Sequence, residues 1–274
     1  MQFSFKVTLG DETVNGTYGG MTFENGVATF TLADGESKTA TGLAAGLTYT
    51  VEETRVDNFT VKYEGETGVI EEGDEPQTAT VTNTHILGDL DVTKTVVSDA
   101  SADKTKVFTF KVTLGDKTIN GTFNGVEFSN GVATFTLKDG ETKAMTGLPT
   151  GITYTVEENT ESGFVTTKTG ETGSISTTKA TAAFTNTRET GDLDVTKTVV
   201  SDASADKTKD FTFRVTLSDT TITKTYGDVA FEDGVATFTL KDGETKAITG
   251  LPTGITYTVE ENTESGFEIG RAHV

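Results

Sequence analysis

Hydrophobic and polar residues alternate along most of this chain, and the alternation has a period of two. Across residues 108–114, Phe, Val and Leu occupy every second position, with Thr and Lys between them. The same alternation returns across residues 132–137 and 152–156. A period of two is typical of a strand that turns one face to the core and the other to solvent. We therefore predict β-strands over these three ranges.

Turn signals separate the predicted strands. Asn130-Gly131 is a strong hairpin signal, because both residues tolerate the backbone angles of a tight two-residue turn. Residues 138–140 and 146–151, the latter with a Pro and two Gly, are predicted as further turns. Short strands with turns every 8–12 residues or so are typical of an all-β sandwich. The polar segment 98–106 is expected to form one helical turn at most.

The chain repeats itself with a period of about 100 residues, the size of a β-sandwich domain. Residues 88–106 recur unchanged at 191–209, and residues 138–164 recur at 241–267 with a single substitution. The N-terminal region carries the same pattern, for example YTVEE at 49–53. Solenoid units, at roughly 20–50 residues, are too short to explain this period.

We divide the chain into three Ig-like β-sandwich repeats: repeat one at residues 1–87, repeat two at 88–190 and repeat three at 191–274. Only repeat two is expected to be whole, because repeat one lacks a counterpart of its first strand and repeat three lacks counterparts of its last strands. The connections between repeats are short, which favours a rod of tandem domains. The sequence IGRAHV at 269–274 is expected to be non-native, because one reading frame of a widely used sequencing adapter encodes it.

Composition narrows the classes of function. The 22 Lys and Arg residues face 42 Asp and Glu residues, for a net charge of −20, and so acidic a chain argues against nucleic-acid binding. Thiol catalysis and disulfides are excluded by the lack of Cys, and the two His residues disfavour a His-based metal site or a Ser-His-Asp triad. No apolar run reaches about 18 residues, so no membrane insertion is expected within this stretch. No cofactor and no metal are predicted.

The segment SDASAD, at 98–103 and again at 201–206, holds two Asp residues four positions apart. Its spacing differs from that of an EF-hand loop, so calcium binding is the weaker interpretation. We expect a solvated acidic loop, the usual state of a charged run.

Three polar residues of repeat two fall on the inward face of predicted strands. Lys94 continues the inward phase of the first strand, Glu158 that of the ITYTVEE strand, and Asn186 that of the last strand. Each would be costly to bury without a partner. The alternative is that Lys94 extends to solvent at a strand end, Glu158 sits at an edge and Asn186 caps a turn.

A meeting of the three side chains would remove the cost and supply a reaction. Burial disfavours the charged forms of Lys94 and Glu158, so Glu158 can hold a proton while Lys94 is a neutral amine. The amine then attacks the carboxamide carbon of Asn186, ammonia leaves, and an isopeptide bond forms. The reaction occurs once in each molecule, so the chain is not expected to be an enzyme with turnover.

The motifs around these residues resemble those of collagen-adhesin B-type (Cna B-type) repeats. They are DLDVTKTV around Lys94, YTVEEN around Glu158, and FTNTR or VTNTH in the last strands of repeats two and one. The resemblance covers essentially the whole chain. Cna B-type domains are stalk and pilin-like modules of Gram-positive surface proteins, and they form Lys–Asn or Lys–Asp isopeptide bonds with the help of a Glu or Asp.

The resemblance implies a bond between Lys94 and Asn186, with Glu158 as the proton shuttle. Repeats one and three each retain two of the three positions. The equivalents of Glu158 are Glu53 and Glu261, and the remaining bond partners are Asn83 in repeat one and Lys197 in repeat three.

We therefore expect a structural stalk or spacer of a bacterial surface adhesin or pilin-like protein, extracellular and anchored to the cell wall by segments outside this stretch. Expected partners are other domains of the same protein, with host matrix protein or glycan reached through domains outside this stretch. Two alternatives stay open. A host-ligand or glycan-binding module would be favoured by exposed aromatic residues on loops, and accessory repeats of a large secreted enzyme would be revealed by flanking sequence.

Overall fold

The computed structural model describes residues 1–73 and 75–268. The predicted adapter-derived segment, 269–274, lies outside these residues. Met1–Gly88 and Pro149–Gly151 form one compact unit, and the remaining described residues form a second. The first unit holds repeat one, and the second holds repeats two and three apart from Gly88 and Pro149–Gly151.

In repeat one, the described residues form two sheets and a hairpin. One sheet has the order β4-β1-β5-β7, the second pairs β6 with β8, and β2 and β3 form the hairpin. The strands are β1 (Phe3–Leu9), β2 (Gly16–Tyr18), β3 (Met21–Phe23), β4 (Val27–Leu32), β5 (Thr48–Glu53), β6 (Phe59–Glu64), β7 (Thr67–Val69) and β8 (Thr80–His85).

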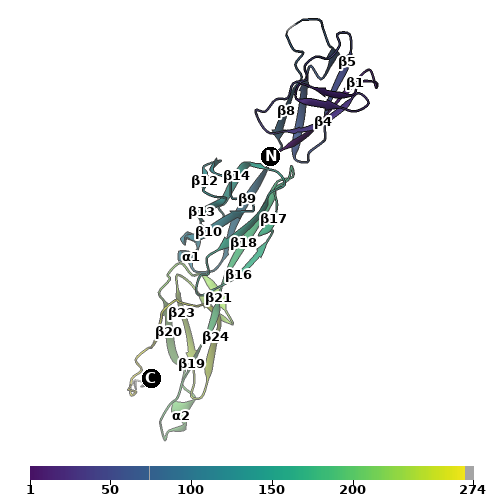
Figure 1. The fold of residues 1–274 in the computed structure, drawn as a ribbon. Helices are drawn as coiled ribbons and strands as arrows, with labels where there is room; N and C mark the ends of the chain where they lie inside the picture. Colours follow the sequence, from purple (N-terminus) through teal and green to yellow (C-terminus); the bar gives the residue numbers. More distant parts are fainter. Residues whose placement is uncertain (74, 269–274) are drawn as a thin grey trace. The chain divides into compact units, whose positions relative to one another are not determined.

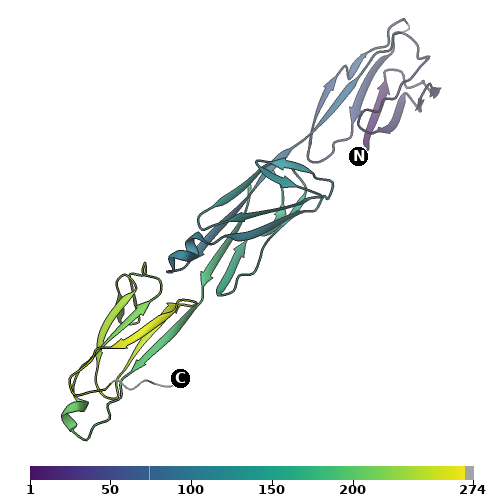
Figure 2. The ribbon, with the colours of Figure 1, turned by 90° about the vertical axis from the view of Figure 1, so that its left-hand side faces the viewer.

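Repeat two has two four-stranded sheets, which Figures 1 and 2 show as two layers. Their orders are β13-β10-β15-β17 and β14-β9-β18-β16, and β11 and β12 form a hairpin. The elements are β9 (Leu87–Val97), α1 (Ser101–Thr105), β10 (Phe108–Leu114), β11 (Gly121–Phe123), β12 (Val126–Phe128), β13 (Val132–Leu137), β14 (Thr142–Pro149), β15 (Thr153–Glu158), β16 (Phe164–Thr169), β17 (Thr172–Ser174) and β18 (Ala180–Arg188).

Repeat three follows the same plan over its described residues. A three-stranded sheet has the order β23-β20-β25, β19 pairs with β24, and β21 and β22 form a hairpin. The elements are β19 (Thr190–Thr196), α2 (Ser204–Lys207), β20 (Phe211–Leu217), β21 (Lys224–Tyr226), β22 (Val229–Phe231), β23 (Val235–Leu240), β24 (Thr245–Pro252) and β25 (Tyr257–Glu261).

The core of repeat two lies between its two sheets and is built from the alternating apolar residues. From one sheet, Phe108, Phe110 and Val112 of β10 are fully buried. From the other, Leu90 and Val92 of β9 are equally buried. Apolar side chains on one face of each strand thus meet across the sandwich, as the period of two requires.

The prediction of an all-β chain of sandwich repeats is confirmed. The two described helices have five and four residues, slightly more than the single helical turn expected at most. Among the residues that the structure describes, no helix is long and apolar enough to cross a membrane.

One predicted turn is wrong in part. Residues 146–149 belong to β14, at the edge of its sheet, and only 150–151 form a turn. Gly147 has a φ of +79°, a backbone conformation that suits glycine. Its N–H donates to Asp89 Oδ1 at 3.1 Å. Pro149 is tolerated because it ends an edge strand. Gly and Pro therefore shape a strand here, where local turn chemistry predicted a loop.

Candidate isopeptide-bond site

The first and last strands of repeat two lie side by side and carry two of the predicted site residues. β9 and β18 pair in parallel, with Phe184 opposite Lys94 and Asn186 opposite Val96. Lys94 and Asn186 therefore stand on adjacent strands of one sheet, and both side chains point into the sandwich. Glu158, at the end of β15, reaches the same place from the opposite sheet.

The three side chains are in direct contact. Lys94 Nζ lies 3.1 Å from Glu158 Oε1 and donates to Oε2 at 3.3 Å. Asn186 Nδ2 donates to Glu158 Oε1 at 2.6 Å. One carboxylate oxygen thus contacts both the nitrogen that would attack and the nitrogen that would leave.

The site is closed to water. The side chains of Lys94 and Glu158 are 0% and 2% exposed, and Asn186 is fully buried. The Phe108 ring covers the amine, with its centroid 4.2 Å from Lys94 Nζ. Burial lowers the pKa of Lys94, and the Glu158 carboxylate opposes this without cancelling it. The fraction of neutral, nucleophilic amine is therefore larger than for a lysine in water.

Repeat one brings together the two residues that it retains. Asn83 Nδ2 donates to Glu53 Oε2 at 2.9 Å, as Asn186 does to Glu158 in repeat two. Glu53 is 8% exposed. Within the described residues, Glu53 Oε1 and Asn83 Oδ1 are buried and accept no hydrogen bond.

Repeat three also brings together its retained pair. Lys197 Nζ donates to Glu261 Oε1 at 2.7 Å, and the Phe211 ring lies 4.0 Å from the amine. Each side chain of the pair is 13% exposed, so the pair is more open to water than its counterpart in repeat two.

Sequence comparison assigns all three repeats to one domain family. A profile described as "Domain of unknown function (DUF7601)" matches residues 1–85, 88–188 and 191–273. The chain belongs to the DUF7601 family. Lys94, Glu158 and Asn186 thus all lie in the second DUF7601 domain, and the partial pairs of repeats one and three lie in the first and third.

A relative of these DUF7601 repeats is the pilus tip adhesin Cpa of Streptococcus pyogenes. It is 40% identical over 77 residues, and the match covers 26% of this chain and 11% of the adhesin. The match confirms the expected resemblance to domains of Gram-positive surface proteins and pilins. The chain thus spans about a tenth of the length of this curated relative.

Solved structures similar to the DUF7601 chain include two major pilins of Streptococcus pyogenes. The T-13 pilin is 19% identical, with 69% of this chain and 90% of the pilin covered at a TM-score of 0.43. Another major pilin is 21% identical, with 65% and 82% covered at a TM-score of 0.38.

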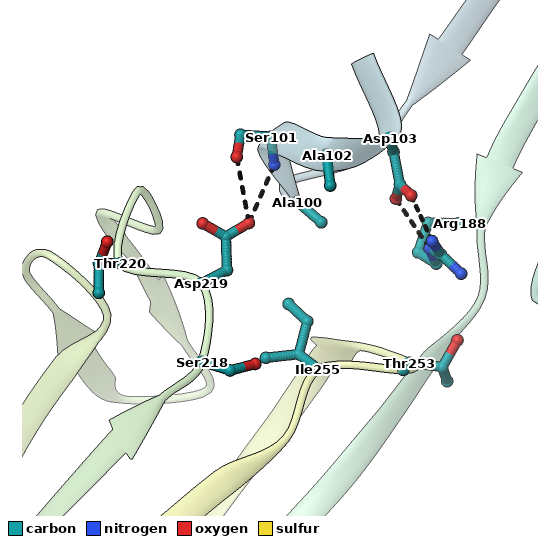
Figure 3. Close-up of a pocket in the computed structure, with 11 residues that line it drawn as sticks. Ala100, Ser101, Ala102, Asp103, Arg188, Ser218, Asp219, Thr220, Thr253 and Ile255 are labelled. Atoms are coloured by element: carbon teal, nitrogen blue, oxygen red, sulfur yellow. Dashed lines mark hydrogen bonds and ion pairs between the residues drawn. The ribbon is translucent and has the colours of Figure 1, made fainter. Parts of the chain in front are cut away.

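The acidic loop of the second DUF7601 repeat departs from its expected solvated state. Asp103 is 3% exposed and lies in α1. Arg188 Nε donates to Asp103 Oδ2 at 2.8 Å, and a second guanidinium nitrogen pairs with Oδ1 (Figure 3). Burial raises the pKa of Asp103, but hydrogen bonds from Arg188 and Ser98 outweigh burial and lower it. The expectation of a solvated loop is therefore wrong for Asp103.

A signal for this ion pair was present in the sequence. Arg188 follows Phe184 and Asn186 at intervals of two, so it continues the inward face of β18. An inward arginine requires an acidic partner, which Asp103 supplies from 85 residues away. Phe108 covers the Lys94 amine, but the sequence identified it only as one of the alternating apolar residues.

A hollow of about 400 Å³ lies beside α1 in the second unit (Figure 3). Its charged lining residues are already engaged: Asp103 with Arg188, and Asp219 with the N–H and hydroxyl of Ser101 at 3.0 and 3.4 Å. Because each of these charged side chains already has a partner, we place the reactive site at Lys94 and not at this hollow.

Proposed function

We propose that this chain is part of the structural stalk of a bacterial surface adhesin or pilus protein, stiffened by an isopeptide bond between Lys94 and Asn186. The observation that carries the proposal is the position of Glu158 Oε1, in contact with Lys94 Nζ and Asn186 Nδ2 inside the buried core. The likeness to a pilus tip adhesin supports an extracellular role beside other domains of the same surface protein. Anchoring to the cell wall, by segments outside this stretch, is part of the proposal.

The bond-forming step balances without a cofactor. The neutral Lys94 amine adds to the Asn186 carboxamide carbon, a new C–N bond forms, and the original C–N bond breaks. Glu158 takes a proton from the attacking nitrogen and delivers one to the leaving nitrogen, so that ammonia departs. Fixed contact between the groups supplies the acceleration that an amide needs. Lys94 and Asn186 are both consumed when the bond forms. This chemistry is therefore maturation, and the chain is not an enzyme with turnover.

A bond between Lys94 and Asn186 would transmit a pulling force through repeat two without loading its other strands. β9 opens repeat two and β18 closes it, and the strands are parallel neighbours. Pulling on the two ends of the repeat therefore shears β9 against β18. A covalent link between them would transmit the force directly. It would also close a loop of about 90 residues, which stabilises the fold by roughly 4–5 kcal/mol on the chain-entropy account.

The test is the intact mass of the full chain. We expect a deficit of about 17 Da, one ammonia, and a cross-linked peptide joining Lys94 to Asn186 after digestion. Lys94→Ala and Glu158→Gln are expected to restore the full mass expected from their sequences. Lys197→Ala is the matched control, because it removes the equivalent lysine of repeat three, and it should leave the deficit intact.

Full mass in the unsubstituted chain would overturn the isopeptide bond. Folding of the variants is checked by circular dichroism, and Glu158→Gln keeps the shape of the side chain if Lys94→Ala fails to fold. Without the bond, a ligand-binding module or an accessory repeat of a secreted enzyme would be as well supported as a stalk.

A further inference from the structure

Repeats two and three, which share the second compact unit, are in contact through side chains as well as through the connecting chain. Asp99, in the loop between β9 and α1, accepts hydrogen bonds from two residues of β21 in repeat three. Its Oδ2 atom lies 2.8 Å from Lys224 Nζ and 3.1 Å from the Tyr226 hydroxyl. Tyr226 is 3% exposed, and burial together with Asp99 raises the pKa of its hydroxyl, which therefore stays a donor.

Two further contacts join the same two repeats. Asp219 of repeat three accepts hydrogen bonds from the N–H and hydroxyl of Ser101, at 3.0 and 3.4 Å (Figure 3). The N–H and hydroxyl of Thr253 both donate to the Glu189 carbonyl oxygen, at 2.9 and 3.0 Å. Each repeat thus offers one aspartate to donors of the other, and a backbone contact lies at the connection between them.

The loop that carries Asp99 is held in place by repeat two itself. Asp103, four residues further on, pairs with Arg188 at the end of β18. The Ser98 hydroxyl donates to Asp103 Oδ2 at 2.5 Å and accepts from the Ala100 N–H at 3.1 Å. The loop therefore needs little further ordering to meet repeat three, and a preorganised partner loses less entropy on binding.

The residues that receive Asp99 distinguish repeat three from the other repeats. Lys224 aligns with Gly121 of repeat two, which has no amine. Tyr226 aligns with Phe123, which has no hydroxyl to donate. Repeat one, with a glycine and a tyrosine at these positions, has the hydroxyl without the amine. Repeat three alone therefore combines both donors.

We propose that Lys224 and Tyr226 form a receptor that recognises Asp99 and locks repeats two and three together as one rigid body. The partner that this receptor fits is the acidic loop of the preceding repeat, residues 98–103. Because both donors are required, a domain with the residues of repeat two at these positions does not accept the loop. The lock acts at the joint between domains, where the isopeptide bond proposed above adds no stiffness, and it does not depend on that bond.

The experiment measures a distance across the joint by pulsed electron paramagnetic resonance on the full chain. Because the chain has no Cys, Thr134→Cys and Thr237→Cys introduce two unique spin-label positions, both exposed and on equivalent strands of the two repeats. We expect one narrow distance distribution. Asp99→Ala should broaden it about twofold, because relative motion of domains is the usual state without a substantial interface.

Asp202→Ala is the matched control, since Asp202 is exposed and occupies the same place in the identical loop of repeat three. It should leave the distribution narrow. The double variant Lys224→Gly, Tyr226→Phe gives repeat three the residues that repeat two carries and folds with. It should broaden the distribution as Asp99→Ala does.

The outcomes separate the lock from the isopeptide bond. A distribution that stays narrow in both Asp99→Ala and the double variant overturns the inference and assigns the stiffness to the connecting chain. A broad distribution in the labelled chain without further substitution also overturns it. Intact mass is recorded for every variant, and the lock predicts the same deficit of about 17 Da in each.

Discussion

Repeats one and two contain closely similar sequences, but one equivalent segment adopts a different structure in each. Residues 142–149 form β14 beside β9 in repeat two, whereas the equivalent residues 37–44 form no strand in repeat one. The buried apolar residues of repeat one are few: Phe5, Val7, Leu9, Phe23 and Ala28. The difference shows that β14 exists because β9 is there to pair with it, since strand structure depends on neighbours more than on local propensity.

Repeat three, which has the first strand that repeat one lacks, supports the same conclusion. It has the counterpart of β9, and its β24 is fully formed. The described residues contain no counterpart of β18, and Tyr257 and Val259 are 52% and 37% exposed where repeat two buries the equivalent pair. The first strand thus organises β14, and the strands that follow β15 in repeat two, β17 among them, cover the tyrosine and valine that repeat three leaves exposed.

The largest expected effect comes from giving repeat one a first strand. Residues 88–107 placed directly before Phe3 would supply β9 and its lysine to Glu53 and Asn83. We expect a second loss of about 17 Da and a gain in unfolding free energy of at least 4–5 kcal/mol in repeat one. Intact mass and urea denaturation measure the two effects.

The control for this graft is the same insertion with Lys94→Ala in the inserted copy only. It should restore the missing strand and bury the apolar face without loss of mass. If the grafted lysine stays free while the strand forms, Glu53 and Asn83 are not equivalent to the pair in repeat two, and the comparison between the repeats breaks down.

A smaller effect is expected from Asp103→Asn, which breaks the buried pair with Arg188. We expect a loss of about 3 kcal/mol at pH 7, because the guanidinium is left without its partner. The folded domain holds the pKa of Asp103 below its ordinary value of 3.8. The pair's contribution is therefore fully present only at pH values well above 3.8 and is lost as pH falls through the lowered value.

Urea denaturation at pH 7, 5 and 3 tests this prediction. The difference in unfolding free energy between Asp103→Asn and the unsubstituted chain should be largest at pH 7 and smallest at pH 3. Asp206→Asn is the matched control, because Asp206 occupies the same loop of repeat three and bonds to Ser201. A gap that does not change with pH would show that Asp103 acts through packing alone.

The smallest effect is expected from Lys111→Ala. Lys111 pairs with Glu157 at 2.9 Å, with side chains 50% and 58% exposed. Similar exposed pairs recur as Lys6–Glu52 and Arg214–Glu260 in the other repeats. Exposed pairs contribute little, so the unfolding free energy should change by less than about 0.5 kcal/mol. A loss above 1 kcal/mol by urea denaturation would contradict this ranking of buried over exposed pairs.

Period-two alternation was sufficient to predict the inward direction of Lys94, Glu158 and Asn186, because each directly continues an apolar face. It did not predict that the three would touch, since that depends on the parallel pairing of β9 with β18 across most of the repeat. The Asp103–Arg188 pair was missed for the same reason. β14 was missed because Gly147 and Pro149 give a turn signal that pairing with β9 overrides.

The strand that completes repeat two has an exact copy in the chain, since residues 88–106 and 191–209 are identical. Side-chain packing therefore cannot tell the two strands apart, and each fits the groove beside β18 equally well. Only chain connectivity selects the correct one, which leaves the tandem array open to exchange of strands between neighbours during folding. A covalent link between β9 and β18 would end this ambiguity, because the first correct pairing would become permanent.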